Sequence, residues 1–237
     1  MTDLSNEKKP ELVQEMFSKI AFRYDLMNRF MTAGQDVLWR KWVIQKTNLP
    51  EKGTLLDLGA GTGDLAREAL RQHPNSRPVA ADFTIEMMRV GRAKHQNNDK
   101  ILYWTAADAT SLPFPNHSFD AVVSGFLLRN VVDIPTCLAE QFRILKPGGH
   151  MVALDTTPPP KNLLTPFMQF HLHTIIPTLG KILTGQQEAY HYLPDSTEGF
   201  LHPEQLAVRL TEAGFENVKF QRLMFGAIAI HWGVKAK

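Results

Sequence analysis

The fold is decided by the stretch Leu55-Leu56-Asp57-Leu58-Gly59-Ala60-Gly61-Thr62-Gly63-Asp64-Leu65. Its apolar first half is typical of a short buried strand, and the residues that follow position 64 begin a helical pattern. The three glycines permit the backbone angles of a tight turn and bring main-chain N–H groups close to a ligand. The stretch therefore predicts a strand, a glycine turn and a helix at the carboxyl edge of a sheet, where ligands bind in α/β folds.

The spacing of these glycines separates two classes of nucleotide site. A dinucleotide-binding turn follows G-x-G-x-x-G and closes with a small residue, whereas this turn runs G-x-G-x-G and continues with Asp64. With Asp57 inside the strand, the pattern resembles the S-adenosyl-L-methionine (SAM) site of class I methyltransferases. In that family the strand acid lies near the ammonium group, and glycines such as Gly59 and Gly61 lie under the ribose and methionine parts. An NAD-dependent oxidoreductase and a purely geometric glycine turn remain the alternatives.

Composition and charge bound the class of protein. A chain of 237 residues with 43% hydrophobic and 21% charged residues can build one α/β domain that carries an insertion. The net charge of +2 supplies no global attraction to nucleic acid, so no nucleic-acid partner is expected. The single cysteine, Cys137, excludes an internal disulfide and a cysteine-rich metal site and is predicted to be buried. No secretory leader or membrane-spanning run is expected, which favours a cytoplasmic location.

Two further strands end in residues that suit a nucleoside. Asp82 closes the predicted strand 77–82, where an acid can accept hydrogen bonds from both ribose hydroxyls. Asp108 and Ala109 follow the predicted strand 101–105, and a carboxylate there could accept the exocyclic amine of adenine while the small residue packs beneath the ring. The spacing from Gly59 to Asp82 is shared by NAD and SAM sites, so it predicts a nucleoside ligand without choosing between them.

The alternation of strands and helices predicts the fold class. Apolar strands at 119–124 and 150–155 flank a helix at 134–145, and the order of elements favours a doubly wound, mostly parallel, Rossmann-like sheet. Strands at 215–221 and 226–232 suit an antiparallel C-terminal hairpin. The predicted parts of this single domain are a helical arm, a SAM-binding core, an insertion between strands five and six, and a C-terminal helix with edge strands, at 1–50, 51–155, 156–202 and 203–237.

The arm and the insertion carry the remaining candidates. A helix at 11–22 precedes a predicted turn that holds Tyr24, Asp25 and Asn28, whose alternative role is to cap the next helix. The apolar insertion could wall a substrate pocket, touch a bilayer surface, or form a plain helix pair, with residues 190–196 as a polar-aromatic loop. His171 and His173 lie two apart with no carboxylate expected nearby, so no metal site is predicted.

Longer motifs resemble a particular family. They are Phe17-x-x-Ile20-Ala21-x-x-Tyr24-Asp25-x-Met27-Asn28, Arg129-Asn130-Val131-x-Asp133, Arg143-x-Leu145-Lys146-Pro147-Gly148-Gly149 and Tyr192-Leu193-Pro194-Asp195-Ser196. In this order they are similar to the ubiquinone/menaquinone biosynthesis C-methyltransferase family over nearly the whole chain. The resemblance implies that SAM methylates a ring carbon of a polyprenylated quinol such as demethylmenaquinol. It also implies that Thr62, Asp82, Asp108 and Ala109 match positions that hold SAM.

The lipidic acceptor implied by this resemblance has consequences for location and assembly. It implies peripheral contact with the inner face of the cell membrane, and the oligomeric state stays open, with a homodimer as one candidate. The acceptor could instead be a different small hydrophobic molecule, including 2-methoxy-6-polyprenyl-benzoquinol. Two rival classes of protein also stay open, a nucleic-acid methyltransferase and a non-catalytic SAM-binding module.

The sequence departs from the family pattern near the acceptor. The family's Ser-Phe-Gly-x-Arg-Asn run aligns with residues 125–130, so that Gly125 stands at the serine position and Ser124 lies one place early. Asp36-Val37 replaces a basic pair, and Asp155 replaces a glutamate. Our hypothesis is that Arg129 stabilises the developing quinolate oxygen while Asp25 or Tyr24 positions or receives the proton. A structural salt bridge is the alternative role for Arg129.

Overall fold

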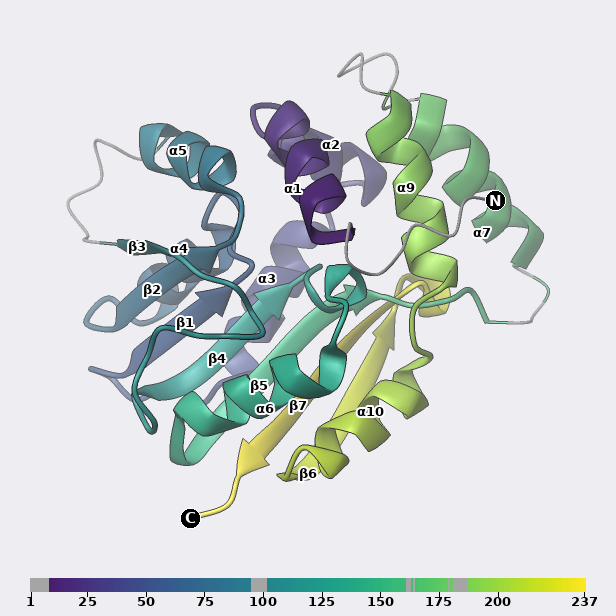
Figure 1. Ribbon diagram of the computed structural model, residues 1–237. Coiled ribbons are helices and arrows are strands. Elements are labelled where there is room, and N and C mark those ends of the chain that lie inside the picture. Colours follow the sequence, from purple (N-terminus) through teal and green to yellow (C-terminus); the bar gives the residue numbers. More distant parts are fainter. Residues whose placement is uncertain (1–8, 95–101, 161–162, 164, 179, 181–186) are drawn as a thin grey trace.

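The computed structural model describes residues 9–94, 102–160, 163, 165–178, 180 and 187–237. Its centre is a seven-stranded sheet with the order β3-β2-β1-β4-β5-β7-β6 (Figure 1). The strands β1 to β5 are parallel, and β7 runs antiparallel to both β5 and β6. Their bounds are β1 Thr54–Leu58, β2 Arg77–Asp82, β3 Tyr103–Ala106, β4 Phe119–Gly125, β5 Leu145–Thr156, β6 Phe215–Leu223 and β7 Ile228–Lys235. The predicted doubly wound sheet with a C-terminal antiparallel hairpin is confirmed.

Helices cover both faces of the sheet because neighbouring strand residues point to opposite sides. Leu56 and Val122 pack with α6 (Ile134–Ile144) and α10 (Pro203–Glu212), in a cluster that includes the buried Cys137. Leu55 and Val123 pack on the other face, with α3 (Asp36–Lys46) and α4 (Asp64–Gln72). The near-continuous apolar sequence of the central strands is therefore explained by burial on both faces.

The N-terminal arm and the insertion lie together over the carboxyl ends of the parallel strands (Figure 1). The arm comprises α1 (Lys9–Ile20) and α2 (Tyr24–Met31), and α5 (Ile85–Lys94) packs beside α1. The insertion comprises α7 (Thr165–Phe170), the π-helical segment η3 (His171–Ile175) and α9 (Gln187–Glu198). Residues from both parts share one buried cluster, built from Ile20, Met27, Ile176 and neighbours that include Leu193.

Three local predictions are wrong, and each has a physical reason. Residues 24–31 form the helix α2 rather than a turn, because the carboxylate of Asp25 binds the glycine turn instead of capping a helix. Residues 190–196 belong to the helix α9 in spite of Pro194, since Leu193 packs into the cluster shared with the arm. The strand predicted at 150–155 is longer, because β5 starts directly after α6, at Leu145, and pairs with β4 through a register shift.

Some predicted helix and strand boundaries lie outside the described ranges. Residues 95 and 101, which end a predicted helix and begin a predicted strand, lie outside them, as do parts of the predicted insertion. Within the described ranges, no helix is long and apolar enough to cross a membrane. The short 3-10 helices η2 (Leu128–Asn130) and η4 (Met224–Gly226) follow β4 and β6 and complete the rim above the sheet.

Candidate functional site

The glycine turn follows β1 at the carboxyl edge of the sheet, as predicted, and the strand order reverses between β1 and β4. Gly61 and Gly63 have φ angles of +56° and +84°, in the left-handed region that favours glycine. A Cβ on Gly63 would lie 2.7 Å from the ring of Trp104, and the N–H of Gly61 donates to the Oδ2 atom of Asp82 at 2.7 Å. The turn is thus fixed both by close packing and by the predicted acid of β2.

Two adjoining hollows open beside this turn, and we call them together the cofactor cleft. Their volumes are about 40 and 100 Å³, and both are lined by Gly59, Gly61 and Gly125. Asp57, Thr62 and Asp64 line the first hollow, and Asp82 and Ala109 line the second. The structure therefore brings the predicted strand acids, the glycines and Ala109 together around one cleft.

The electrostatics of the cleft favour a cation. Asp57 is almost fully buried, and its Oδ2 atom accepts a hydrogen bond from the Ala66 N–H at 2.9 Å. Burial, reinforced by the negative charges of Asp64 and Asp82, raises the pKa of Asp57 to about 7. Asp64 is paired with Arg40 at 2.9 Å, whereas Asp57 has no ion-pair partner among the described residues. The ammonium and sulfonium groups of SAM would supply the missing positive charge, so the residues present fit this ligand.

The nucleoside end of the cleft has one buried acid and one exposed acid. Asp82 accepts from the N–H groups of Gly61 and Thr84, both at 2.7 Å, and its oxygens keep lone pairs for further donors. Burial raises the pKa of Asp82. Asp108 is exposed and accepts from the N–H and the hydroxyl of Thr110, at 2.8 and 2.7 Å. It does not line the second hollow, although its neighbour Ala109 does.

A short chain of polar contacts ties the arm to the glycine turn. The hydroxyl of Thr62 donates to Asp25 Oδ1 at 2.7 Å, and Lys94 Nζ lies 2.6 Å from Asp25 Oδ2. Asp25 lines neither hollow, whereas Tyr24 lines both. Burial raises the pKa of the Tyr24 hydroxyl, and the positive charge of Arg129 partly opposes this rise.

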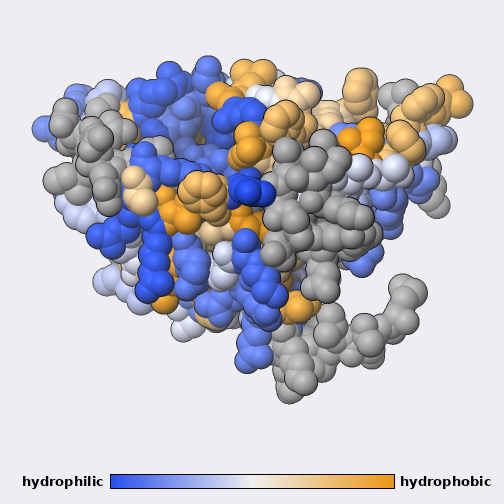
Figure 2. Space-filling view, turned by 90° about the horizontal axis from the view of Figure 1, so that it is seen from above, coloured by the Kyte–Doolittle hydropathy of each residue, from blue (hydrophilic) through white to orange (hydrophobic). Residues whose placement is uncertain are grey.

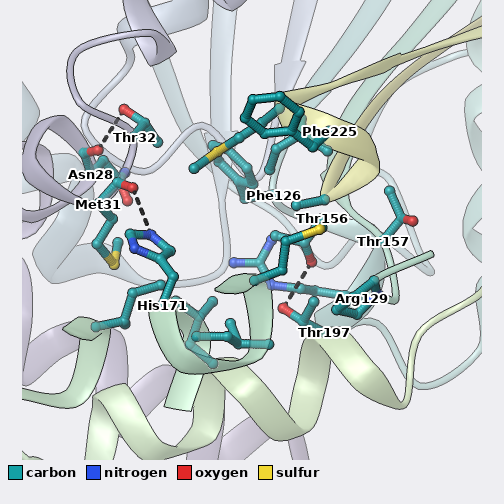
Figure 3. A pocket seen from close by; sticks show the side chains of 18 of the residues that line it. Asn28, Met31, Thr32, Phe126, Arg129, Thr156, Thr157, His171, Thr197 and Phe225 are labelled. Carbon is teal, nitrogen blue, oxygen red and sulfur yellow. Dashed lines mark hydrogen bonds between the residues drawn. The ribbon is translucent and has the colours of Figure 1, made fainter. Parts of the chain in front are cut away.

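A larger apolar cavity adjoins the cleft (Figure 3). It has a volume of about 300 Å³ and is enclosed by α2, α7, η3, α9, the end of β5 and the η4 turn. Asn28 and Phe126 line both this cavity and the cofactor cleft, so the two spaces meet at these residues. Phe126 has a φ of +62°, a strained value for a bulky residue, at the carboxyl end of β4. Such strain concentrates at functional sites.

Arg129 lines the apolar cavity and also makes a buried ion pair. Its Nη1 atom lies 2.6 Å from Asp155 Oδ1, and both side chains are nearly inaccessible to solvent. Its Nε atom is buried without a hydrogen-bond partner among the described residues. The structural salt bridge expected as one possible role of Arg129 is therefore present. The catalytic roles of Arg129, Asp25 and Tyr24 stay predictions.

Several residues beyond the predicted site residues bear on this region. Ser124 is buried, and its hydroxyl has no hydrogen-bond partner among the described residues, whereas Gly125 reaches the cleft, which agrees with the aligned positions. The expectation that no carboxylate lies near the histidines is wrong, because His173 pairs with Glu198 at 2.7 Å. In the part of the chain that the structure describes, no three His, Cys, Asp or Glu side chains are grouped as a metal site would need. His171 lines the apolar cavity, which its sequence spacing could not indicate.

Comparisons with solved structures agree with this fold. The chain superposes with a TM-score of 0.66 and 20% identity on the methyltransferase bound to the Trm112 activator of Haloferax volcanii, covering 93% of this chain and 98% of that one. Phosphoethanolamine N-methyltransferase 2 of Haemonchus contortus, solved with SAM, gives a TM-score of 0.63 at 16% identity over 84% of this chain and 52% of that one. The fold is that of class I SAM-dependent methyltransferases, as predicted.

Comparisons with curated sequences are more specific. The ubiquinone/menaquinone biosynthesis C-methyltransferase UbiE of Desulfotalea psychrophila is 46% identical over 94% of this chain and 90% of its own length. The demethylmenaquinone methyltransferase of Thermus thermophilus is 39% identical over 92% of this chain and 99% of its own length. The model of the ubiE/COQ5 methyltransferase family matches residues 1–235. These matches span nearly the whole chain, and the protein belongs to the ubiE/COQ5 methyltransferase family.

Proposed function

We propose that this protein is a SAM-dependent C-methyltransferase that methylates a ring carbon of a polyprenylated quinol, with demethylmenaquinol as the acceptor and menaquinol as the product. The names of its relatives in Desulfotalea psychrophila and Thermus thermophilus support this reaction class. The observation that carries the proposal is the meeting of a polar cleft with an apolar cavity at Asn28 and Phe126. A charged cofactor and a hydrophobic acceptor would then meet beside these two residues.

The cofactor cleft supports specific roles for the predicted SAM residues. Asp57 would hold the ammonium group, while Gly59, Gly61 and Thr62 form the floor on which the methionine part and ribose lie. Asp82 would accept the ribose hydroxyls, and Asp108 and Ala109 would hold adenine. When bound, SAM supplies an electrophilic methyl group on its sulfonium. The protein's own task is to align the acceptor, exclude water and manage one proton.

The acceptor end is built around Arg129. Arg129 lines a mostly apolar cavity, where a fixed positive charge would stabilise a developing quinolate oxygen more strongly than it would in water. Asp155 holds the guanidinium in place from the end of β5. Tyr24 lines the cofactor cleft and could position the same oxygen. Asp25 does not line the cleft and would act indirectly, through its hydrogen bond with Thr62. The predicted insertion, 156–202, would cover the acceptor.

The mouth of the cavity supports peripheral membrane contact. Phe167 and Phe225 line the cavity, yet 72% and 74% of their surfaces are exposed, and Phe170 of α7 is 58% exposed beside them. Figure 2 shows apolar side chains gathered on the right of the view, the side on which α7 lies in Figure 1. An exposed apolar patch around an apolar opening suits a bilayer surface that delivers a polyprenyl chain.

A mass-spectrometric assay tests the reaction. Purified protein is incubated with SAM and demethylmenaquinol in detergent, and the quinol is scored for the mass of one added methyl group together with release of S-adenosylhomocysteine. The benzoquinol acceptor, 2-methoxy-6-polyprenyl-benzoquinol, is run in parallel. Methylation of demethylmenaquinol supports the proposal, and methylation of the benzoquinol alone would change the acceptor. Binding of SAM without methylation of either quinol would instead indicate a non-catalytic SAM-binding module.

A further inference from the structure

The described residues that line the apolar cavity include one imidazole, a group that can act as a base. Two of the described lining residues have titratable side chains, Arg129 and His171. Arginine stays protonated in proteins, and this one is paired with Asp155 at 2.6 Å. The other polar lining residues are threonines and an asparagine, which are poor bases. Asp25, the carboxylate considered from the sequence, does not line the cavity and is engaged by Thr62 and Lys94.

The contacts of His171 leave one ring nitrogen free to act as a base. Its Nε2 atom lies 3.2 Å from the carbonyl oxygen of Met31 in α2 (Figure 3). Because a carbonyl only accepts hydrogen bonds, Nε2 carries the proton and the lone pair of the neutral ring is on Nδ1. Nδ1 has no hydrogen-bond partner among the described residues. The same carbonyl would stabilise the imidazolium that forms when Nδ1 takes a proton.

His171 contacts Met31, which lies one turn of α2 from Asn28, where the apolar cavity meets the cofactor cleft. Met31 follows Asn28 by three residues on α2, so the two lie on the same side of that helix. Asn28 lines both spaces. His171 begins the π-helical segment η3, a distortion that is frequent at functional sites. An acceptor oxygen near Asn28 would therefore lie between two cavity walls, one with His171 and one with Arg129.

We propose that His171 is a catalytic base that takes the proton of the acceptor's ring hydroxyl. This inference rests on the proposed function. The O–H bond breaks, the proton goes to Nδ1, and the electron pair stays on the oxygen, from which charge is delocalised to a ring carbon. That carbon would bond to the methyl group as the methyl–sulfur bond breaks, and the sulfur would keep the electron pair of that bond and leave as a neutral thioether. When that carbon later loses its hydrogen to water as a proton, the imidazolium returns its proton to the oxygen and the aromatic quinol is restored.

The surrounding charges are compatible with this role. Arg129 is the other charged group among the described residues that line the cavity, and Asp155 balances it. His173 and Glu198 pair with each other and do not line the cavity. The neutral imidazole is the active form, so the turnover number should fall in acidic solution.

The first test compares His171→Gln with the matched control His173→Gln, two residues away. The turnover of His171→Gln should fall by about 100-fold or more, with SAM affinity and the thermal midpoint unchanged, whereas His173→Gln should stay within about twofold of wild type. The acidic limb of the pH profile should be lost with His171→Gln, and added imidazole should restore part of the turnover of His171→Ala. Wild-type turnover in His171→Gln, or an unaltered pH profile with no rescue, would overturn the proposal.

A second readout needs no turnover. The absorbance of 1-naphthol bound without SAM should show partial ionisation to naphtholate at pH 8 in the wild type and in His173→Gln, but not in His171→Gln. Equal ionisation in all three proteins would contradict the role of His171. If ionisation depends on His171 while the wild type methylates no quinol, the proposed function fails and the assignment of the base stands.

Discussion

We expect Asp57 to make the binding of SAM depend on pH. Burial raises its pKa to about 7, against an ordinary value of about 3.9 in the unfolded chain. Its ionisation between these two pH values therefore destabilises the ligand-free fold as the pH rises, and a bound ammonium group would offset that cost. We predict that SAM affinity increases with pH up to about 7, and that binding at pH 6.5 releases a proton.

Calorimetry in buffers of different ionisation enthalpy measures that proton. Asp57→Asn should weaken SAM binding by about 10-fold or more and remove the proton release, without lowering the thermal midpoint of the ligand-free protein at pH 8. The control is Asp120→Asn, because Asp120 pairs with Lys146 and does not line the cleft. Unchanged proton release in Asp57→Asn would show that another group senses the ligand.

Arg129 should have separable structural and catalytic effects. Arg129→Met leaves the buried Asp155 without its ion-pair partner, which typically costs about 3–5 kcal/mol. Adding Asp155→Asn removes the uncompensated charge, so the double variant should regain much of the free energy of unfolding measured in urea. Turnover should stay low in both variants while SAM affinity changes little. Recovery of turnover together with stability would reduce Arg129 to a structural role.

At the scale of elements, α2 acts as a strap across the glycine turn. The Thr62 hydroxyl and Lys94 hold Asp25, so that the first turn of α2 is fastened both to the cleft and to α5. Hydrogen bonds to charged groups contribute about 1.5–3 kcal/mol. We predict that Thr62→Val increases the dissociation rate of SAM several-fold and speeds hydrogen exchange in α2. Thr211→Val, which removes an exposed hydroxyl bonded to Ala207 in α10, should do neither.

The elements that the sequence predicts best are those with local signals. The strand acids Asp57 and Asp82 and the glycines between them lie within a short stretch whose spacing encodes the turn and the cleft. The apolar cavity has no such signal, because Asn28, Arg129 and His171 come from segments that meet only after folding. Pro194 shows the same limit, since its local preference against a helix is overcome by the packing of Leu193 with residues of the distant arm.

For the molecule as a whole, we predict a contact with lipid in which the opening of the apolar cavity faces the bilayer. The double variant Phe167→Ser/Phe225→Ser should bind less to anionic phospholipid vesicles in a flotation assay, because it loses two exposed aromatic side chains. Val208→Ser serves as the control, since Val208 is a 55% exposed apolar residue on α10 that does not line the cavity. Equal flotation of all three proteins would place the membrane contact elsewhere or exclude it.

We propose that the quinol occupies the apolar cavity while SAM occupies the adjoining cleft. The most direct measurement is methyl transfer to demethylmenaquinol, with SAM affinity determined in parallel, in Met168→Trp and in the control Gln169→Trp. Both residues are on α7, which buries none of its side chains, but only Met168 lines the cavity. We expect Met168→Trp to lose turnover, or to raise KM for the quinol at least 10-fold, with unchanged SAM affinity. Gln169→Trp should have the turnover and KM of the wild type. Wild-type kinetics in Met168→Trp would contradict this proposal.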